Sequence, residues 1–408
     1  MKRRQLLMGG AVLGAQTFLQ QVHAQGSMPP TPLIDPALPL KRFVAAPDQI
    51  TALKVCLRPF RAAGPRLDVE PVAGKTVIHN YGHGGSGWSL SWGAANIAVG
   101  KAAAKLEKKI AIIGCGIIGL TSALMAQRAG FDVTIYTRDM LFQSRSVRAN
   151  GSWTPDSRIA LTEQAGPQFG DLWEQMARFS WSAYRDYLGL PGNPIDFIDT
   201  YVLSDKRQED KFHEEIDRSK PTYATTGEPQ QGAEFARYYS RITDIIPASV
   251  PLDSGHTPFG VASAKRVRRM MYNFGAYGHL LLSEFHQAGG RIVMREFHAP
   301  SDLAALREKV IINCPGYAAR DWWRDKSIIP VRGQTAWLPP DPTLHYGLAY
   351  RGAEMLSKSD GIMIQGYDLD HLGEMSGVGN SFEHPDRIEA EHAINIFAGL
   401  FARAPAQG

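Results

Sequence analysis

The feature that most constrains this chain is a strand–glycine–helix pattern that begins near residue 110. A short apolar strand leads into GCGIIG at 114–119, a helix-forming stretch follows, and a second apolar strand lies at 132–136. Glycines at these spacings have separate purposes: Gly114 allows a tight turn, Gly116 lets the backbone approach a pyrophosphate, and Gly119 lets the helix pack closely on the strand. The pattern predicts a βαβ unit that binds a dinucleotide.

The residues around this unit indicate how such a ligand is held. Amide N–H groups at the start of the helix, those of Ile117 and Ile118, together with the positive helix end, suit a pyrophosphate. About 20 residues further on, the second strand ends at Arg138 and Asp139. Asp139 can accept a hydrogen bond from a ribose hydroxyl, and Arg138 can lie against the adenine. The motif alone does not separate FAD from NAD.

Charge and cysteine content exclude several other classes. The formal net charge is +4 and no long lysine or arginine run occurs, so a nucleic-acid partner is not expected. The three cysteines, Cys56, Cys115 and Cys314, form no CxxC pair, which argues against a disulfide framework or a zinc site. We expect no metal, and we expect Cys115 and Cys314 to be small core residues.

The N-terminus has the pattern of an export signal. Lys2, Arg3 and Arg4 precede an apolar stretch that is too short to span a bilayer comfortably, and Val22-His23-Ala24 is a small-x-small cleavage pattern. The paired arginines favour a twin-arginine route, which carries folded proteins, over a plain secretory signal or an uncleaved anchor. We therefore expect residues 1–24 to be a signal peptide. The mature protein is expected to be periplasmic or secreted, without stable membrane insertion.

Four further segments resemble the D-amino-acid oxidase family. NYGHGGSGWSLSWG at 80–93 resembles its long glycine-rich signature, and LRPFR at 57–61 resembles the strand that carries its substrate arginine. ANGSWTP at 149–155 is similar to its flavin-contacting turn, and INCPG at 312–316 is similar to a strand end that follows. The resemblance implies FAD as the cofactor and an amino acid, with oxygen, as the small-molecule partners.

The order of these segments departs from the family. The glycine-rich strand at 114–119 opens proteins of that family, and the segments found here at 57–93 close them, which indicates a circular permutation. We expect an α/β (α+β) fold with a Rossmann-like FAD-binding domain and a mixed-sheet substrate domain. The predicted FAD-binding domain comprises 64–153 and 276–317. The predicted substrate-binding domain comprises 25–63, 154–275 and 318–408.

The resemblance also assigns cofactor contacts. Glycine in the 80–93 segment lets backbone approach the flavin where a Cβ would prevent it, and a helix that begins near Trp92 can aim its positive end there. The residues implied at the isoalloxazine are Gly84, Gly85, Ser86, Gly87, Trp88 and Ser89. Those implied at its other side are Ser146, Gly151 and Ser152, with Arg145 towards the phosphates and the backbone near His298 at the adenine.

Three residues are predicted to handle the substrate. Arg58 suits a clamp on the substrate carboxylate, because guanidinium binds carboxylate bidentately. By resemblance the Tyr350 hydroxyl supports that carboxylate, and the carbonyl of Gly85 accepts from the substrate amine. The second tyrosine of the family falls on Glu354 here, and Tyr346 is the nearby candidate to replace its hydroxyl.

These features predict oxidative deamination of D-amino acids. One alternative is a flavin amine oxidase or dehydrogenase acting on glycine-like or N-methylated amines, which would keep the FAD site and loosen the role of Arg58. A second alternative is a non-catalytic flavoprotein that binds or senses redox state. Retention of Arg58 and Tyr350 argues against the second.

Overall fold

Two β-sheets organise the part of the chain that the computed structural model describes, which is residues 40–205, 233–252, 259–369 and 372–403. The predicted signal peptide therefore lies outside the described residues, as does most of a polar stretch at 204–236 for which we predict an exposed excursion. None of the helices within the described ranges is both long and apolar enough to cross a membrane.

The first sheet is built around the predicted βαβ unit. Its central strands pair in parallel, and its edge strand β2 runs antiparallel to β3. In sheet order its six strands are β2 (Val69–Val72), β3 (Lys75–His79), β10 (Val310–Asn313), β4 (Lys109–Ile113), β5 (Asp132–Thr137) and β9 (Arg291–Met294). The strands β4 and β10 are runs of apolar residues, as expected where both faces of a parallel sheet are buried.

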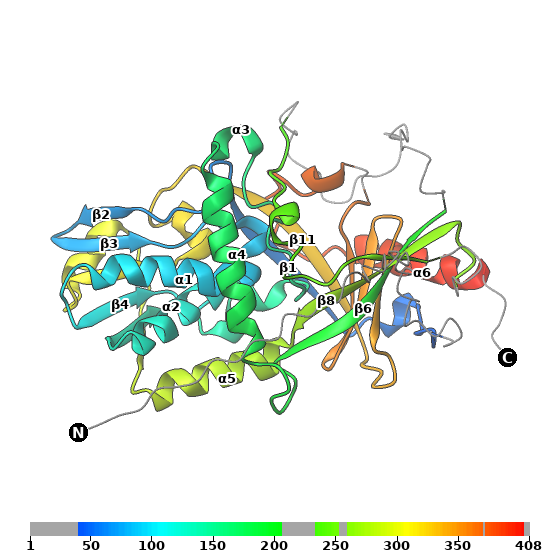
Figure 1. Cartoon of the computed structure of the whole chain (residues 1–408), viewed down its shortest axis with the longest axis horizontal. Coiled ribbons are helices and arrows are strands. Elements are labelled where there is room, and N and C mark those ends of the chain that lie inside the picture. Colours follow the sequence, from blue (N-terminus) through cyan, green and yellow to red (C-terminus); the bar gives the residue numbers. More distant parts are fainter. Residues whose placement is uncertain (1–39, 206–232, 253–258, 370–371, 404–408) are drawn as a thin grey trace, which may run out of the picture. The chain divides into compact units, whose positions relative to one another are not determined.

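Helices pack against this sheet and against one another. They are α1 (Gly87–Ala103), α2 (Ile117–Arg128), α4 (Phe169–Arg185) and α5 (Phe274–Gln287). Figure 1 shows α1 and α2 beside β3 and β4, with α4 crossing over α1. A Cβ at Gly93 of α1 would collide with the α4 backbone at Met176, so glycine permits this close crossing. The aromatic side chains of α4 that face the core include Trp173 and Tyr184, which are fully buried, as is usual for aromatic residues at helical spacing.

The second sheet is mixed and has eight strands. All neighbouring strands pair antiparallel except β12 and β6, which pair in parallel. In sheet order they are β1 (Ala52–Arg61), β11 (Ile328–Leu338), β14 (Gly361–Gly366), β13 (Ala353–Lys358), β12 (Tyr346–Tyr350), β6 (Ile195–Ser204), β8 (Ser263–Tyr272) and β7 (Val250–Leu252). Helix α6 (Arg387–Arg403) covers one face through an apolar cluster that contains Phe397 and Met355. A short helix, α3 (Thr162–Ala165), precedes α4.

These observations confirm the predicted mixed α/β fold class; the two domain boundaries stay predictions. One element differs from expectation. Helix α1 begins at Gly87 rather than near Trp92, directly after a single 3-10 turn at Gly84–Ser86, and it ends at Ala103. The second half of the glycine-rich segment, from Gly87 onward, therefore lies in the helix, and only its first half precedes it.

Candidate functional site

A cavity of about 550 Å³ opens at the carboxyl ends of the parallel strands. Ligands of open α/β sheets bind at this edge because the loops that follow the strands converge there. The turn between β4 and α2 forms one wall and the glycine-rich segment before α1 forms another. The other walls come from β1 and from three loops, at residues 143–149, 295–297 and 314–318, and from Glu383 and His384.

The start of α2 forms the first ligand-facing feature. Gly114 has a φ of +97°, a conformation that favours glycine, and a Cβ at Gly119 would collide with the Gly114 carbonyl. The amide of Ile117 donates to Ser146 Oγ at 3.0 Å. A Cβ at Gly116 would lie 3.0 Å from that same oxygen, so Gly116 leaves the space in front of the helix open.

The start of α1 forms the second ligand-facing feature of the cavity. Gly84 has a φ of +55°, and a Cβ there would collide with the carbonyl of Arg158. The amide of Gly85 donates to the Ser157 carbonyl at 3.0 Å. The protein's own backbone thus requires glycine at 84, while Gly87 and Trp88 bring the positive helix end into the cavity.

Two buried side chains that line the cavity carry polar atoms without partners among the described residues. These atoms are His83 Nε2 and Asn80 Oδ1, on side chains of residues that are 2% and 0% exposed. Burial lowers the pKa of His83 to about 3, so its imidazole is neutral at physiological pH. Buried polar atoms are costly to leave unpaired. Two helix starts and these two atoms in one cavity fit a dinucleotide such as FAD.

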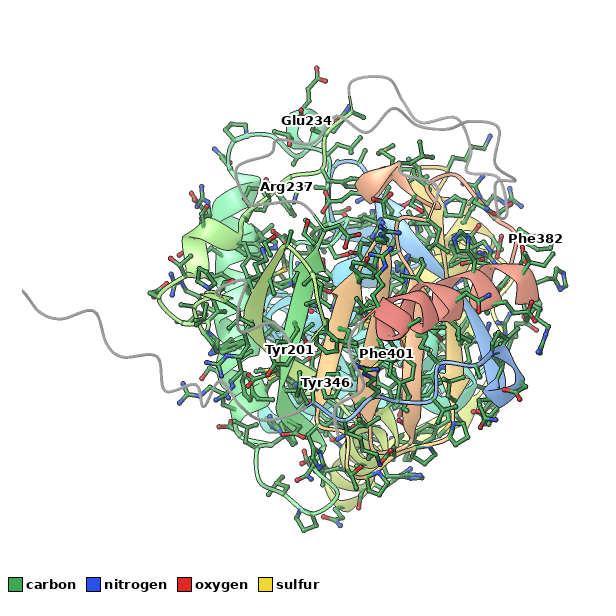
Figure 2. The ribbon with its side chains drawn as sticks, turned by 90° about the vertical axis from the view of Figure 1, so that its right-hand side faces the viewer. Tyr201, Glu234, Arg237, Tyr346, Phe382 and Phe401 are labelled. Carbon is green, nitrogen blue, oxygen red and sulfur yellow. The ribbon has the colours of Figure 1, made fainter. Side chains whose placement is uncertain are left out.

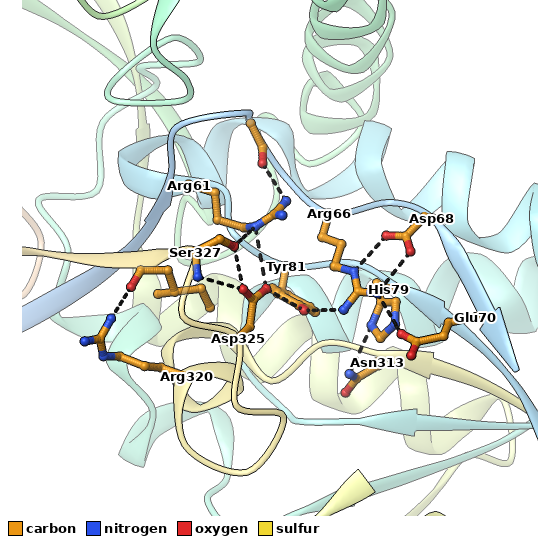
Figure 3. Close-up of polar contacts among 12 residues, drawn as sticks. Arg61, Arg66, Asp68, Glu70, His79, Tyr81, Asn313, Arg320, Asp325 and Ser327 are labelled. Atoms are coloured by element: carbon orange, nitrogen blue, oxygen red, sulfur yellow. Dashed lines mark hydrogen bonds and ion pairs between the residues drawn. The ribbon is translucent and has the colours of Figure 1, made fainter. Parts of the chain in front are cut away.

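A polar network fixes the strand end that leads into the glycine-rich segment (Figure 3). Tyr81 donates to Asp325 at 2.9 Å and accepts from Arg66 at 3.0 Å. Arg66 also pairs with Asp68 at 2.9 Å and with Glu70 at 2.7 Å. Asp68 and Glu70 lie close enough to His79 to ligate a metal, but the Arg66 guanidinium already supplies a positive charge between them.

Arg58 reaches the cavity from β1. Its guanidinium lies over Gly333 of β11, where a Cβ would collide with it. Among the described residues it makes one hydrogen bond, to the Arg332 carbonyl at 3.3 Å, and no carboxylate lies within ion-pair distance. Burial lowers the pKa of the Arg58 guanidinium. The ordinary pKa of arginine is so high that the side chain still remains a cation. A bridge between Phe60 and His83 holds β1 against the glycine-rich segment.

Most of the predicted site residues line this one cavity. They are Arg58, Gly84, Gly85, Gly87, Trp88, Gly114, Gly116, Ile117, Ile118, Arg138, Asp139, Arg145 and Ser146. Arg138 pairs with Asp139 at 2.7 Å and with Glu296 at 3.3 Å, and Arg145 pairs with Glu383.

The structure does not bring the other predicted residues to the cavity wall. Ser86 Oγ donates to the Ser157 carbonyl at 3.0 Å, and Ser89 Oγ accepts from the Thr154 amide at 2.8 Å, so both hydroxyls tie the glycine-rich segment to a neighbouring loop. Gly119 lies behind Gly114. The turn at Gly151 and Ser152 packs on β8 and beneath the Lys358 side chain. The exposed His298 lies beside Phe297, which does line the cavity.

Tyr350 was expected at the substrate carboxylate but does not line the cavity, and the alternation of side chains along its strand explains why. Along β13 and β12, Ala349 is opposite Glu354 and Tyr350 is opposite Ala353. Neighbouring residues of a strand point to opposite faces, so Tyr350 faces the α6 side. There its hydroxyl donates to Asp205 at 2.8 Å and accepts from Arg403 at 2.9 Å.

Tyr346 and Glu354, the two residues considered for the place of the family's second tyrosine, do not line the cavity either. Tyr346 also faces α6, beside Tyr201 and in one cluster with Phe401 (Figure 2). Glu354 faces the opposite way but is buried in an ion pair with Arg269.

Several lining residues escaped sequence reasoning. They include Asn80, His83, Arg148, Arg295, Glu296, Tyr317, Trp322, Glu383 and His384. Asn80 and His83 could have been predicted, because polar side chains within the glycine-rich segment indicate contact with a ligand. Glu383 and His384 carry none, because they reach the cavity from a loop more than 200 residues away in sequence from Arg145 and Arg148.

Comparison with known proteins agrees with the geometry of a dinucleotide site. A family model described as FAD dependent oxidoreductase matches residues 109–406. The chain belongs to this family, whose cofactor is FAD.

Individual relatives are more distant. The D-amino-acid oxidase of Streptomyces coelicolor is 25% identical over 254 residues, which are 61% of this chain and 64% of that enzyme. That of Rubrobacter xylanophilus is 24% identical over 230 residues, or 56% and 59%. The chain thus spans less than two thirds of either relative. A solved L-amino acid deaminase from Proteus vulgaris matches with a TM-score of 0.45 at 10% identity, over 73% of this chain and 75% of that one.

We predict that the FAD is held non-covalently. Cys56, Cys115 and Cys314 all line the cavity, but burial raises their pKa, to about 11 for Cys115 and about 12 for Cys314. Protonated thiols are poor nucleophiles. After acid precipitation of the purified protein, the flavin absorbance is expected in the supernatant. A yellow pellet that survives washing would contradict this.

Proposed function

We propose that the protein catalyses oxidative deamination of D-amino acids. An amino acid, oxygen and water give a 2-oxo acid, ammonia and hydrogen peroxide. Membership of the FAD dependent oxidoreductase family supports the reaction class, and the D-amino-acid oxidases of two bacteria support the substrate.

The observation that carries the proposal is Arg58. An arginine that lines a cavity without a carboxylate partner among the described residues is poised for an anionic ligand. It lies on the strand that the Phe60–His83 bridge holds against the glycine-rich segment, and Arg58 and Gly85 line the same cavity.

The chain's own residues then have simple tasks. Arg58 binds the substrate carboxylate and fixes its orientation, and the Gly85 carbonyl accepts a hydrogen bond from the amine. A bound FAD would supply the acceptor for the hydride of Cα and the route of its electrons to oxygen. No side-chain base is required if the amine binds neutral, so positioning is the main contribution of the protein.

A substrate panel tests the proposal. Peroxide release is expected with neutral D-amino acids such as D-alanine, and not with their L-enantiomers. The alternative is oxidation of glycine-like or N-methylated amines. It gains support from Tyr350, which pairs with Asp205 and does not line the cavity, so one of the two predicted side-chain contacts to a substrate carboxylate is missing there. Faster turnover of glycine or sarcosine than of every D-amino acid would establish that alternative. Absence of flavin bleaching by any amine under anaerobic conditions would point to a non-catalytic flavoprotein.

We also propose that the protein is exported and that the order of its segments is a circular permutation of the order in the family. The first proposal rests on Lys2, Arg3 and Arg4 and the cleavage pattern that ends at Ala24. The second rests on the family match, which starts at residue 109, after the glycine-rich segment at 80–93. Replacing Arg3 and Arg4 by lysine is expected to keep the protein in the cytoplasm; unchanged secretion would contradict the twin-arginine route.

A further inference from the structure

Two arginines and one glutamate form a cluster on the cavity wall. Arg145 and Arg148 lie on a single 3-10 turn, Arg145–Arg148, and Glu383 lies between their guanidinium groups. Arg145 binds Glu383 bidentately, with Nε–Oε1 at 2.7 Å and Nη2–Oε2 at 2.6 Å. Arg148 Nη1 donates to Glu383 Oε1 at 3.1 Å. This is the geometry in which an arginine pair holds an oxyanion.

The backbone that carries Glu383 is fixed from behind. Arg332 donates to the carbonyl of Phe382 at 3.0 Å and to that of His384 at 3.3 Å, on either side of Glu383. Arg332 in turn pairs with Glu389 of α6 at 2.6 Å. Because these bonds hold the main chain and not the Glu383 side chain, the carboxylate can leave the arginines by side-chain rotation alone.

The cluster carries surplus positive charge. Two guanidinium groups share one carboxylate, and Arg58 adds a third cation, since Arg58, Arg145, Arg148 and Glu383 all act electrostatically on the Cys56 thiol. The cluster also lies between the start of α2 and β1, the strand that carries Arg58. Ser146, next to Arg145, accepts from the first amide of α2, whereas Arg148 reaches back to the carbonyl of Val55 on β1.

We propose that Arg145 and Arg148 form an oxyanion-binding site whose internal ligand is Glu383, and that a phosphate or carboxylate group of a bound molecule takes the place of the Glu383 carboxylate. The oxyanion has two possible sources. One is the diphosphate of the dinucleotide at the start of α2, and the other is a second carboxylate on an acidic substrate held by Arg58. Binding of the dinucleotide diphosphate can be measured without turnover. Binding of a substrate carboxylate rests on the proposed function.

The first arm of the test measures binding to full-length apoprotein. Glu383→Gln keeps the size of the side chain and removes the charge that competes for the arginines. We expect FAD to bind about tenfold more tightly to this variant, by quenching of flavin fluorescence. ADP, which carries the diphosphate without the flavin, should displace FAD more readily. Glu391→Gln is the matched control, because Glu391 pairs with Arg387 on the exposed face of α6 and should leave both affinities unchanged.

The second arm distinguishes the substrate as the source. If FAD affinity is unchanged in Glu383→Gln but the KM for D-aspartate falls relative to that for D-alanine, the site takes a substrate carboxylate. Either gain should vanish in the double variant Glu383→Gln with Arg148→Met. No change in either quantity, weaker FAD binding, or a gain that survives Arg148→Met would overturn the proposal. Failure of the proposed function alone would leave the FAD arm intact.

Discussion

Gly116→Val is expected to yield a folded protein that no longer retains FAD. A Cβ at this position lies 3.0 Å from Ser146 Oγ, which is tight but tolerable with a small shift of a side chain. The methyl groups of valine would extend into the cavity in front of Ile117 and Ile118, where the helix start presents its amides. The obstruction therefore falls on the ligand and not on the packing of the fold.

The expected loss of FAD affinity is large. Displacing the diphosphate breaks charge-assisted hydrogen bonds that contribute about 1.5–3 kcal/mol each. Two such bonds amount to a roughly 10²- to 10⁴-fold weaker affinity, measured by titrating apoprotein with FAD. Gly100→Ala is the matched control: Gly100 is an exposed position of α1 with open space around it, so flavin content should be normal. Normal flavin content in Gly116→Val, with unchanged circular dichroism, would refute the placement of the diphosphate.

Local sequence patterns predicted the nucleotide-binding sheet well. The strand at Lys109–Ile113 and the helix at Ile117–Arg128 form where the glycine pattern places them, because Gly114 adopts a φ of +97° and Gly119 packs on the Gly114 carbonyl within the same unit. The start of α1 was predicted five residues late. Glycine normally lowers helix propensity, and the glycines at 84 and 85 are set by the neighbouring loop at Ser157 and Arg158, which the local sequence does not reveal.

The positions of Tyr350 and Glu383 depend on long-range contacts that the local sequence does not show. Tyr350 was predicted from an alignment of residues, but its side of the sheet is decided by its pairing with Ala353, and a shift of one residue reverses the face. Glu383 was not predicted at all. Its role depends on a loop that Arg332 anchors and on two arginines that are distant in sequence. Neither relation leaves a periodic or spaced signal in the chain.

Arg58→Ala is expected to lose activity on amino acids while keeping FAD. The flavin-facing walls are formed by the glycine-rich segment and the start of α2, neither of which rests on the Arg58 side chain, so the absorption spectrum should persist. Lys54→Ala is the matched control, since Lys54 is a cation on the same strand that stacks on Trp337 at 4.0 Å and does not line the cavity.

The size of the loss follows from the two charge-assisted hydrogen bonds that a guanidinium makes to a carboxylate. At about 1.5–3 kcal/mol each, their removal lowers kcat/KM for D-alanine by roughly two to four orders of magnitude. Arg58→Lys keeps the charge but not the bidentate geometry, so its activity should lie between the two. Amines without a carboxylate never use the clamp, and any turnover of them should change little. The decisive measurement is kcat/KM for D-alanine in wild type and Arg58→Ala at matched flavin occupancy. Loss of two charge-assisted hydrogen bonds should lower it by at least about a hundredfold. A loss below about threefold would remove Arg58 from the substrate site.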